Sequence, residues 1–244
     1  MRRKLKIVIW IVVIVGIIAA VKYADYRFQK QKISAVIIDI DINGSEQLIE
    51  EDEIRALIQQ GHDSLQHQEV GDIDLQMLEN LIKTNPYVYS VNAFINMDAS
   101  LEIEVVQRKP LIRLFNTRGE SYYIDKDGAL LPLHPTTSVY VPVASGIIEG
   151  VFQPSLELRR FDTITEDQCA IIPVEEKLFH MAEIIVEDSL LSQLVAQIYV
   201  VDPSHFELVP RIGNHKIIFG DADDSREKLM KLRYFYSEAY NQYD

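Results

Sequence analysis

The first pattern along the chain is an uninterrupted apolar run at residues 7–21, which follows a start rich in arginine and lysine. As a helix this run covers about 22 Å of a hydrocarbon core that is about 30 Å thick, and the wider window 5–24 covers about 30 Å. The wider window requires Lys6 and Lys22 to extend their ammonium groups toward the headgroups, as basic side chains near helix ends do. Valine and isoleucine are poor helix formers in water, but in lipid a helix lets the backbone pair its own polar groups. The pattern therefore predicts a transmembrane helix.

The flanks of this run distinguish a retained anchor from a cleaved signal. Beyond Gly16 the sequence offers no clean small-x-small cleavage site, which favours an uncleaved anchor. Basic residues precede the span, and the positive-inside bias places them in the cytoplasm. We expect a cytoplasmic segment 1–6, a transmembrane helix 7–24 and a juxtamembrane linker 25–32, in a single-pass type II topology with an extracytoplasmic large domain.

After the linker, the pattern becomes that of a globular α+β module over residues 33–108. Residues 33–42 are β-branched and partly alternating, which predicts a strand, and an Asn-Gly turn follows it. Acidic residues at 50–53 begin a helix, because carboxylates suit the positive end of the helix dipole. A second helix ends before Pro86 and has an apolar face made by Leu75, Leu78, Leu81 and Ile82.

Two alternating stretches complete this module as a hairpin with one buried face and one solvated face. The second stretch alternates apolar residues with glutamates over 101–105, after a turn at 98–100. On the first stretch, the side chains expected on the buried face are Tyr89, Val91, Ala93, Ile95 and Met97. The predicted order is strand, helix, helix, strand, strand.

Residues 109–244 form a second module that is rich in predicted strands. Gly119 and Gly128 mark turns that need a positive φ, and residues 147–173 are irregular by pattern. A helix over 175–188 carries an apolar stripe of Leu178, Met181, Ala182 and Ile185. Strands are expected at 111–115, 121–124, 196–200, 206–210 and 216–220.

The pattern predicts a final helix that starts at Asp224, with Glu227 as its capping-box partner. At about 100° per residue, Tyr234 lies away from the apolar stripe of this helix. That stripe is interpreted as core and comprises Leu229, Leu232, Tyr236, Ala239, Tyr240 and Tyr243.

Charge is divided sharply along the chain. The formal net charge is −13 overall, with +7 in residues 1–32 and −20 in the remainder. An acidic ectodomain argues against nucleic-acid binding, because neutralising phosphates needs a basic face. Cys169 is the single cysteine, which excludes an internal disulfide and a cysteine-based zinc site, so the core alone must hold the fold.

Several short strings, taken in order, carry a resemblance to a known family. They are NPYV at 85–88, LEIEV at 101–105, QRKP at 107–110, YYID at 122–125, LPL at 131–133 and VPVASG at 141–146. Together with the type II anchor and the order of elements, they resemble the POTRA domain and the β-rich domain of the bacterial division proteins FtsQ/DivIB. The resemblance implies an α+β fold: a transmembrane helix, a POTRA-like β-α-α-β-β domain over 33–108, and a β-rich domain with flanking helices over 109–244.

One feature departs from the family. Its second domain usually continues past the last helix into terminal strands, which recruit partner subunits together with that helix, whereas this sequence ends at Asp244. The resemblance leaves open whether the partner edge is built differently or the chain is shortened.

No constellation with a catalytic or metal-binding spacing stands out. His62 and His67 are five residues apart and do not share a helix face. The acidic string at 221–224 lacks the glycine and the glutamate of a calcium loop, and it is interpreted as a helix start, like the cluster at 50–53. We expect no catalytic residue, no metal, no cofactor and no small-molecule substrate.

The resemblance implies a non-catalytic scaffold in the bacterial inner membrane at the division septum. It would bind FtsL and FtsB/DivIC-type proteins, and through them influence septal peptidoglycan synthases. Strand addition to an exposed sheet edge is the expected mode of binding, although an interior strand at 216–219 remains an alternative. The expected partner contacts are Lys216, Ile217, Ile218, Phe219, Lys231 and Tyr234.

Two other classes of function remain open. A POTRA-containing envelope transport or assembly factor would usually carry several such domains, and one is predicted here. A membrane-anchored hydrolase would need a carboxylate pair, which leaves no spacing signature.

Overall fold

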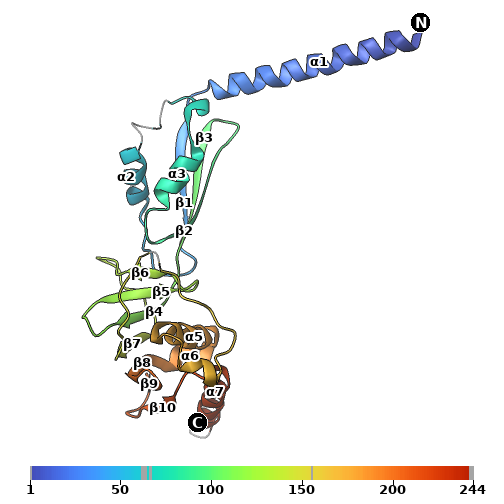
Figure 1. Cartoon of the computed structure of the whole chain (residues 1–244). Coiled ribbons are helices and arrows are strands. Elements are labelled where there is room, and N and C mark those ends of the chain that lie inside the picture. The colour runs from blue at the N-terminus through green and yellow to red at the C-terminus, as the bar shows by residue number, and fades with distance from the viewer. Residues whose placement is uncertain (1, 62–64, 66–67, 155, 242–244) are drawn as a thin grey trace. The chain divides into compact units, whose positions relative to one another are not determined.

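The computed structural model describes residues 2–61, 65, 68–154 and 156–241, with side chains described between residues 9 and 238 (Figure 1). The chain divides into two compact units. The first comprises Met1–Asp41 and Ile49–Gln107, and the second comprises Ile42–Leu48 and Arg108–Asp244.

The N-terminal helix α1, Arg2–Gln29, contains the apolar run. Its part Ile9–Gln29 is long and apolar enough to cross a membrane, and none of that window is buried against protein. An apolar helix without a protein surface against it needs lipid around its side chains. The helix continues for eight residues past Val21, the end of the apolar run.

The rest of the first unit has the predicted order of elements. Its three-stranded sheet has the order β1-β3-β2, with β1 parallel and β2 antiparallel to β3. The helices α2 and α3 contact one another, and α3 lies against β2 (Figure 1). Asp74 begins α3 by accepting a hydrogen bond from the Met77 N–H at 2.9 Å. The elements are β1 Ala35–Asp41, α2 Glu51–Gly61, the 3₁₀ turn η1 Val70–Asp72, α3 Leu75–Ile82, β2 Val88–Ile95 and β3 Ser100–Gln107.

The predicted buried face of β2 is wrong at both ends. The register between β2 and β3 shifts between Val88 and Ser90, so an extra residue bulges out of the ladder. This bulge turns Val88 into the core and leaves Tyr89 44% exposed. Met97 lies beyond the end of β2, in the turn, and is 95% exposed.

The second unit contains a seven-stranded sheet with the order β10-β9-β8-β7-β4-β5-β6. β7 is parallel to both β4 and β8, and all other pairs are antiparallel. Gly146 at the end of β7 has φ +108°, and a Cβ there would lie 2.2 Å from the Val200 carbonyl oxygen. The strands are β4 Pro110–Phe115, β5 Ser121–Asp125, β6 Leu130–Pro132, β7 Val143–Gly146, β8 Val195–Asp202, β9 His205–Pro210 and β10 Ile217–Gly220.

Helices complete the core of the second unit (Figure 1). The predicted stripe on α5 is confirmed, because Leu178, Met181, Ala182 and Ile185 are all fully buried. On α7, Leu229 and Tyr236 are buried and Leu232 packs beside them, whereas the predicted core side chains Ala239, Tyr240 and Tyr243 lie outside the described part. The helices are α4 Glu166–Cys169, α5 Val174–Glu187, α6 Ser189–Leu194 and α7 Ser225–Asn241.

The start of α7 differs from its prediction. The Asp224 N–H donates to the Ile164 carbonyl oxygen at 3.0 Å, and the Glu227 carboxylate pairs with Lys231 at 2.6 Å. The predicted capping box between Asp224 and Glu227 is therefore replaced by two other interactions. Asp224 also has φ +46°, which is not the extended geometry of an N-cap residue.

Candidate partner-binding edge

β10 forms one edge of the seven-stranded sheet (Figure 1). Within the described residues it pairs with β9 alone, with Ile217 opposite Leu208 and Ile218 opposite Glu207. A strand at an edge has unpaired backbone N–H and C=O groups on its outer side. The alternative that residues 216–219 form an interior strand is therefore wrong.

The opposite edge of this sheet is covered. β6 carries Pro132, which cannot donate to a ladder, and the chain around Glu157 lies alongside this edge. Ala129 forms an isolated β-bridge with Glu157. The Leu130 N–H donates to the Leu156 carbonyl oxygen at 3.4 Å. The Leu158 N–H donates to the Gly128 carbonyl oxygen at 2.9 Å. Of the two edges, β10 is the one available to another strand.

The side chains of β10 alternate between the core and the outside. Phe219 is 9% exposed, and the Lys228 ammonium lies 5.6 Å from the centre of its ring. Ile218 is 85% exposed, and Lys216 forms an ion pair with Glu207 at 2.8 Å. An exposed isoleucine on an open strand is an apolar contact for whatever covers the edge.

The outer face of α7 contains the two other predicted contact residues. Lys231 is paired along the helix with Glu227, and Tyr234 is 68% exposed. The sequence analysis missed Phe235, which is 64% exposed and meets Tyr236 edge to face with ring centroids 5.4 Å apart. Helical periodicity could have found it, because one residue after Tyr234 lies about 100° around the helix and off the buried stripe.

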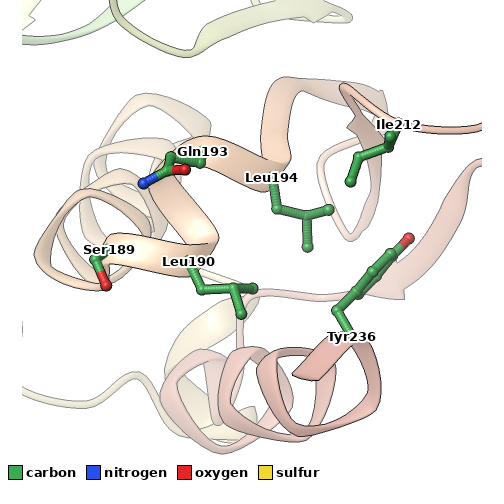
Figure 2. A pocket seen from close by; sticks show the side chains of 6 residues that line it. All are labelled: Ser189, Leu190, Gln193, Leu194, Ile212 and Tyr236. Carbon is green, nitrogen blue, oxygen red and sulfur yellow. The ribbon is translucent and has the colours of Figure 1, made fainter. Parts of the chain in front are cut away.

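A pocket of about 550 Å³ lies beside α7 (Figure 2). One wall is α6, a six-residue helix that the sequence analysis did not predict. Ile212 and Tyr236 line the other side, and His215 Nε2 shares a hydrogen bond with the Tyr236 hydroxyl. Burial raises the pKa of Tyr236, so its hydroxyl stays protonated and can donate. The walls from α6 are Ser189, Leu190, Gln193 and Leu194.

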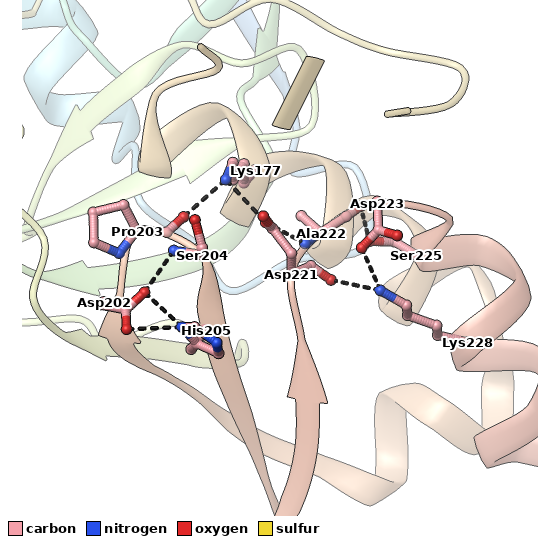
Figure 3. Close-up of polar contacts among 10 residues, drawn as sticks. All are labelled: Lys177, Asp202, Pro203, Ser204, His205, Asp221, Ala222, Asp223, Ser225 and Lys228. Carbon is pink, nitrogen blue, oxygen red and sulfur yellow. Dashed lines mark hydrogen bonds and ion pairs between the residues drawn. The ribbon is translucent and has the colours of Figure 1, made fainter. Parts of the chain in front are cut away.

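A buried lysine fixes the connection between β10 and α7 (Figure 3). Lys177 on α5 is 1% exposed, and its ammonium donates to Asp221 Oδ1 at 2.9 Å and to the Pro203 carbonyl oxygen at 2.8 Å. Burial alone would raise the pKa of Asp221, but the hydrogen bonds from Lys177 and the Ala222 N–H outweigh it and lower this pKa. Asp221 therefore stays ionised and holds the end of β10 against α5.

A second lysine fastens the same connection from the side of α7. Lys228 donates to the Asp221 carbonyl oxygen at 3.0 Å and pairs with the Asp223 carboxylate (Figure 3). In the neighbouring turn, the Asp202 carboxylate accepts from the Ser204 N–H at 2.8 Å, which shapes the loop that presents the Pro203 carbonyl oxygen to Lys177. Asp221 and Asp223, in the acidic string after β10, therefore form ion pairs with lysines of the same unit.

Groups suited to catalysis or metal binding are dispersed among the described residues. No set of three or more His, Cys, Asp or Glu side chains there could hold a metal ion. Burial and the nearby Asp221 raise the pKa of the Cys169 thiol to about 11, so it is protonated near neutral pH. His62 and His67 lie outside the described residues.

Two family models match this chain. The model for FtsQ/DivIB, C-terminal related, matches residues 109–244, which is more than half of the chain. The chain belongs to the FtsQ/DivIB, C-terminal related family. A POTRA-like domain model matches residues 31–106, and a search of curated proteins gave no match.

Family membership confirms the expected relationship to FtsQ/DivIB and the α+β fold with a POTRA-like domain. It makes this chain a cell division protein, in a family whose members act as non-catalytic scaffolds through protein–protein interactions. The apolar helix α1 suits a single-pass membrane protein of this family.

Proposed function

We propose that this protein is a non-catalytic bitopic scaffold of the division machinery, which binds FtsL and FtsB/DivIC-type proteins and through them influences septal peptidoglycan synthesis. It sits in the inner membrane at the septum with residues 1–6 in the cytoplasm. The POTRA-like domain, residues 33–108, and the β-rich domain, residues 109–244, are extracytoplasmic. The β-rich domain binds the partner proteins, at its strand β10.

The observation that carries this proposal is the contrast between the two edges of the seven-stranded sheet. β10 has an open outer side and a largely exposed Ile218, whereas β6 is covered around Glu157. An extended partner segment that adds to β10 gains backbone hydrogen bonds, and alternate side chains along it give specificity.

The surroundings of β10 favour a partner with a second, apolar contact. Tyr234 and Phe235 leave most of their ring surface exposed on α7, and the pocket lined by Leu190 and Tyr236 lies beside the same helix. Exposed aromatic side chains and apolar pockets are both typical anchor points of protein interfaces. We expect the partner strand to cover Ile218 and a following segment to contact Tyr234 and, through its ammonium, Lys231.

The edges of the first unit are less suited to strand addition. β1 carries the exposed carboxylates of Asp39 and Asp41, and charges along an edge discourage pairing. On β2, the Ala93 N–H is already bonded to Glu79 Oε1 at 2.9 Å. These features support the assignment of binding to β10.

The test is capture of FtsL and FtsB/DivIC-type proteins from the same organism by the full-length chain in nanodiscs. Ile218→Lys places a charge on the open edge and is expected to reduce affinity at least about tenfold, since apolar burial and pairing are both lost. Ile171→Lys is the matched control, because Ile171 is 80% exposed and lies outside β10 and α7. Equal capture by both variants would refute binding at β10, and no capture by the folded wild-type chain would refute the proposed function.

A transport or assembly role predicts another phenotype. Depletion of a division scaffold gives filamentous, undivided cells, whereas depletion of an assembly factor gives loss of outer-membrane proteins. Hydrolysis of a cell-wall substrate by purified protein, abolished by a single carboxylate substitution, would contradict the non-catalytic assignment.

A further inference from the structure

The last turns of α1 have a basic and aromatic face. At about 100° per residue, Lys22, Tyr23, Tyr26 and Arg27 fall within an arc of about 140°. Ala24, Asp25, Phe28 and Gln29 occupy the rest of the circumference. We call the first four residues the basic–tyrosine face; both of its tyrosines are at least 60% exposed.

The end of α1 is fastened to the first unit. A Cβ on Gly71 would lie 3.3 Å from the Gln29 side chain, and the Val70 N–H donates to the Gln31 carbonyl oxygen at 2.9 Å. Lys30 pairs with Glu69 at 2.6 Å, and a backbone bridge joins Lys32 to Glu69. Gln29 lies at least about 120° around the helix from Tyr23 and Arg27, and all four residues of the basic–tyrosine face remain exposed beside these contacts.

The two cations of this face, Lys22 and Arg27, are exposed. Among the described residues, no carboxylate forms an ion pair with Lys22 or Arg27. Residues 1–32 carry a net charge of +7, whereas the chain beyond residue 32 has a net charge of −20. An anionic group outside the chain would complement the basic–tyrosine face.

We propose that the basic–tyrosine face binds anionic phospholipid headgroups on the side of the membrane where α1 emerges. With residues 5–24 covering the hydrocarbon core, residues 25–29 extend about 7–8 Å beyond it, and a headgroup layer is about 5–7 Å thick, so the last turns of α1 lie at headgroup depth. Tyrosine rings favour this depth, and basic side chains near a membrane are attracted by anionic lipids. The inference requires α1 to span the membrane but does not depend on which proteins bind β10.

This contact with lipid fixes the orientation of the first unit relative to the membrane. Because residues 68–71 hold the end of α1, the tilt and rotation that the headgroups impose on the helix are transmitted to the POTRA-like domain. Lipid composition thereby sets which surfaces of that domain face the bilayer.

The experiment places a nitroxide at position 31 of the full-length chain in a Cys169→Ser background. Gln31 is exposed and lies two residues after Gln29, the last residue of α1. The chain is inserted in nanodiscs of phosphatidylcholine alone, or of an equal mixture with phosphatidylglycerol, and collisions with a water-soluble relaxation agent are measured. Phosphatidylglycerol is expected to lower the collision rate about twofold, and high salt is expected to reverse this.

Lys22→Gln/Arg27→Gln should abolish the response to phosphatidylglycerol. The control Lys83→Gln/Arg118→Gln removes the same charge from exposed positions elsewhere and should keep it. Arg27→Gln alone lies outside the apolar run and should lose part of the response to phosphatidylglycerol. This single variant replaces the double variant if the latter inserts poorly into the membrane. No response in the wild-type chain, or an unchanged response in the Lys22/Arg27 variant, would overturn the proposal. Release of the wild-type chain by alkaline carbonate would instead remove its premise, the membrane span.

Discussion

Replacing Lys177 by methionine tests whether a buried charge positions the candidate binding edge. Methionine has a similar length and keeps the packing of the side chain beside Phe206, whose ring centre lies 5.9 Å from the Lys177 ammonium. The substitution removes the bond to Asp221 and the bond to the Pro203 carbonyl oxygen. Both acceptors then lose a donor in a site where Lys177 was 1% exposed.

The expected loss in the free energy of unfolding is about 2–4 kcal/mol. Breaking a buried ion pair by removing one partner typically costs 3–5 kcal/mol, because the other charge stays buried without compensation. Asp221 is 25% exposed, so water can solvate part of its carboxylate and the loss lies toward the lower end. In the double variant Lys177→Met/Asp221→Asn, the loss should be smaller than the sum of the two single losses by about 1–3 kcal/mol.

The pH dependence has a defined sign. The pKa of Asp221 is lowered in the folded chain relative to an unfolded value of about 3.9. The unfolded state therefore binds more protons, and the stability from this pair is present above that value and is lost as the pH falls through the folded pKa. In Lys177→Met, unfolding free energy should depend less on pH over this acidic window.

The measurements are denaturant unfolding of the full-length chain and native-state hydrogen exchange, which reports on β10 and α7 separately. Lys216→Met is the matched control, since the Lys216 side chain is 67% exposed, against 1% for Lys177, and its ion pair with Glu207 should be worth less than about 1 kcal/mol. Equal stability and equal exchange of the two variants would refute the view that Lys177 holds this connection.

Three further experiments test the bulge in β2, the close approach at Gly146 and the burial of Cys169. Val88→Ala should lower the unfolding free energy by about 1–3 kcal/mol, because Val88 is buried, and Tyr89→Ser should lower it less, because Tyr89 is 44% exposed. The reverse order in denaturant unfolding would contradict the bulge in β2. Gly146→Ala should destabilise the second unit by more than about 3 kcal/mol, since its Cβ would meet a carbonyl oxygen of β8; a melting temperature equal to wild type would show that β7 can shift. Cys169, with its pKa raised to about 11, should react with iodoacetamide near neutral pH only after unfolding, and rapid labelling of the native chain in a mass-spectrometric assay would count against its burial.

Periodicity predicts those elements whose side chains repeat on one face. The stripe of Leu178 and Ile185 on α5 and the alternation of Leu101 and Ile103 on β3 both lie in the core, as expected. α6 escaped prediction because six residues span too few turns for a periodic stripe, and its start depends on a local bond from the Leu190 N–H to Asp188.

The candidate edge could be predicted only in part. The strand-like pattern at 216–220 placed Ile218 and Phe219 on a strand, but whether it is interior or outermost depends on the order of all seven strands. β7, far away in the sequence, inserts between β4 and β8, and no local pattern reveals that arrangement. Likewise, a lysine in an amphipathic helix usually lies at the surface, so the burial of Lys177 follows from the distant Asp221.

The covered strand β6 limits how copies of this protein can associate. A fibre can grow by backbone pairing only if every copy has two free sheet edges. Among the described residues, the sheet of the second unit has one, at β10. Backbone pairing between copies through this sheet is therefore restricted to a closed two-fold dimer at β10. Such a dimer would occupy the same hydrogen-bonding groups as an incoming division protein, so self-pairing and recruitment exclude each other.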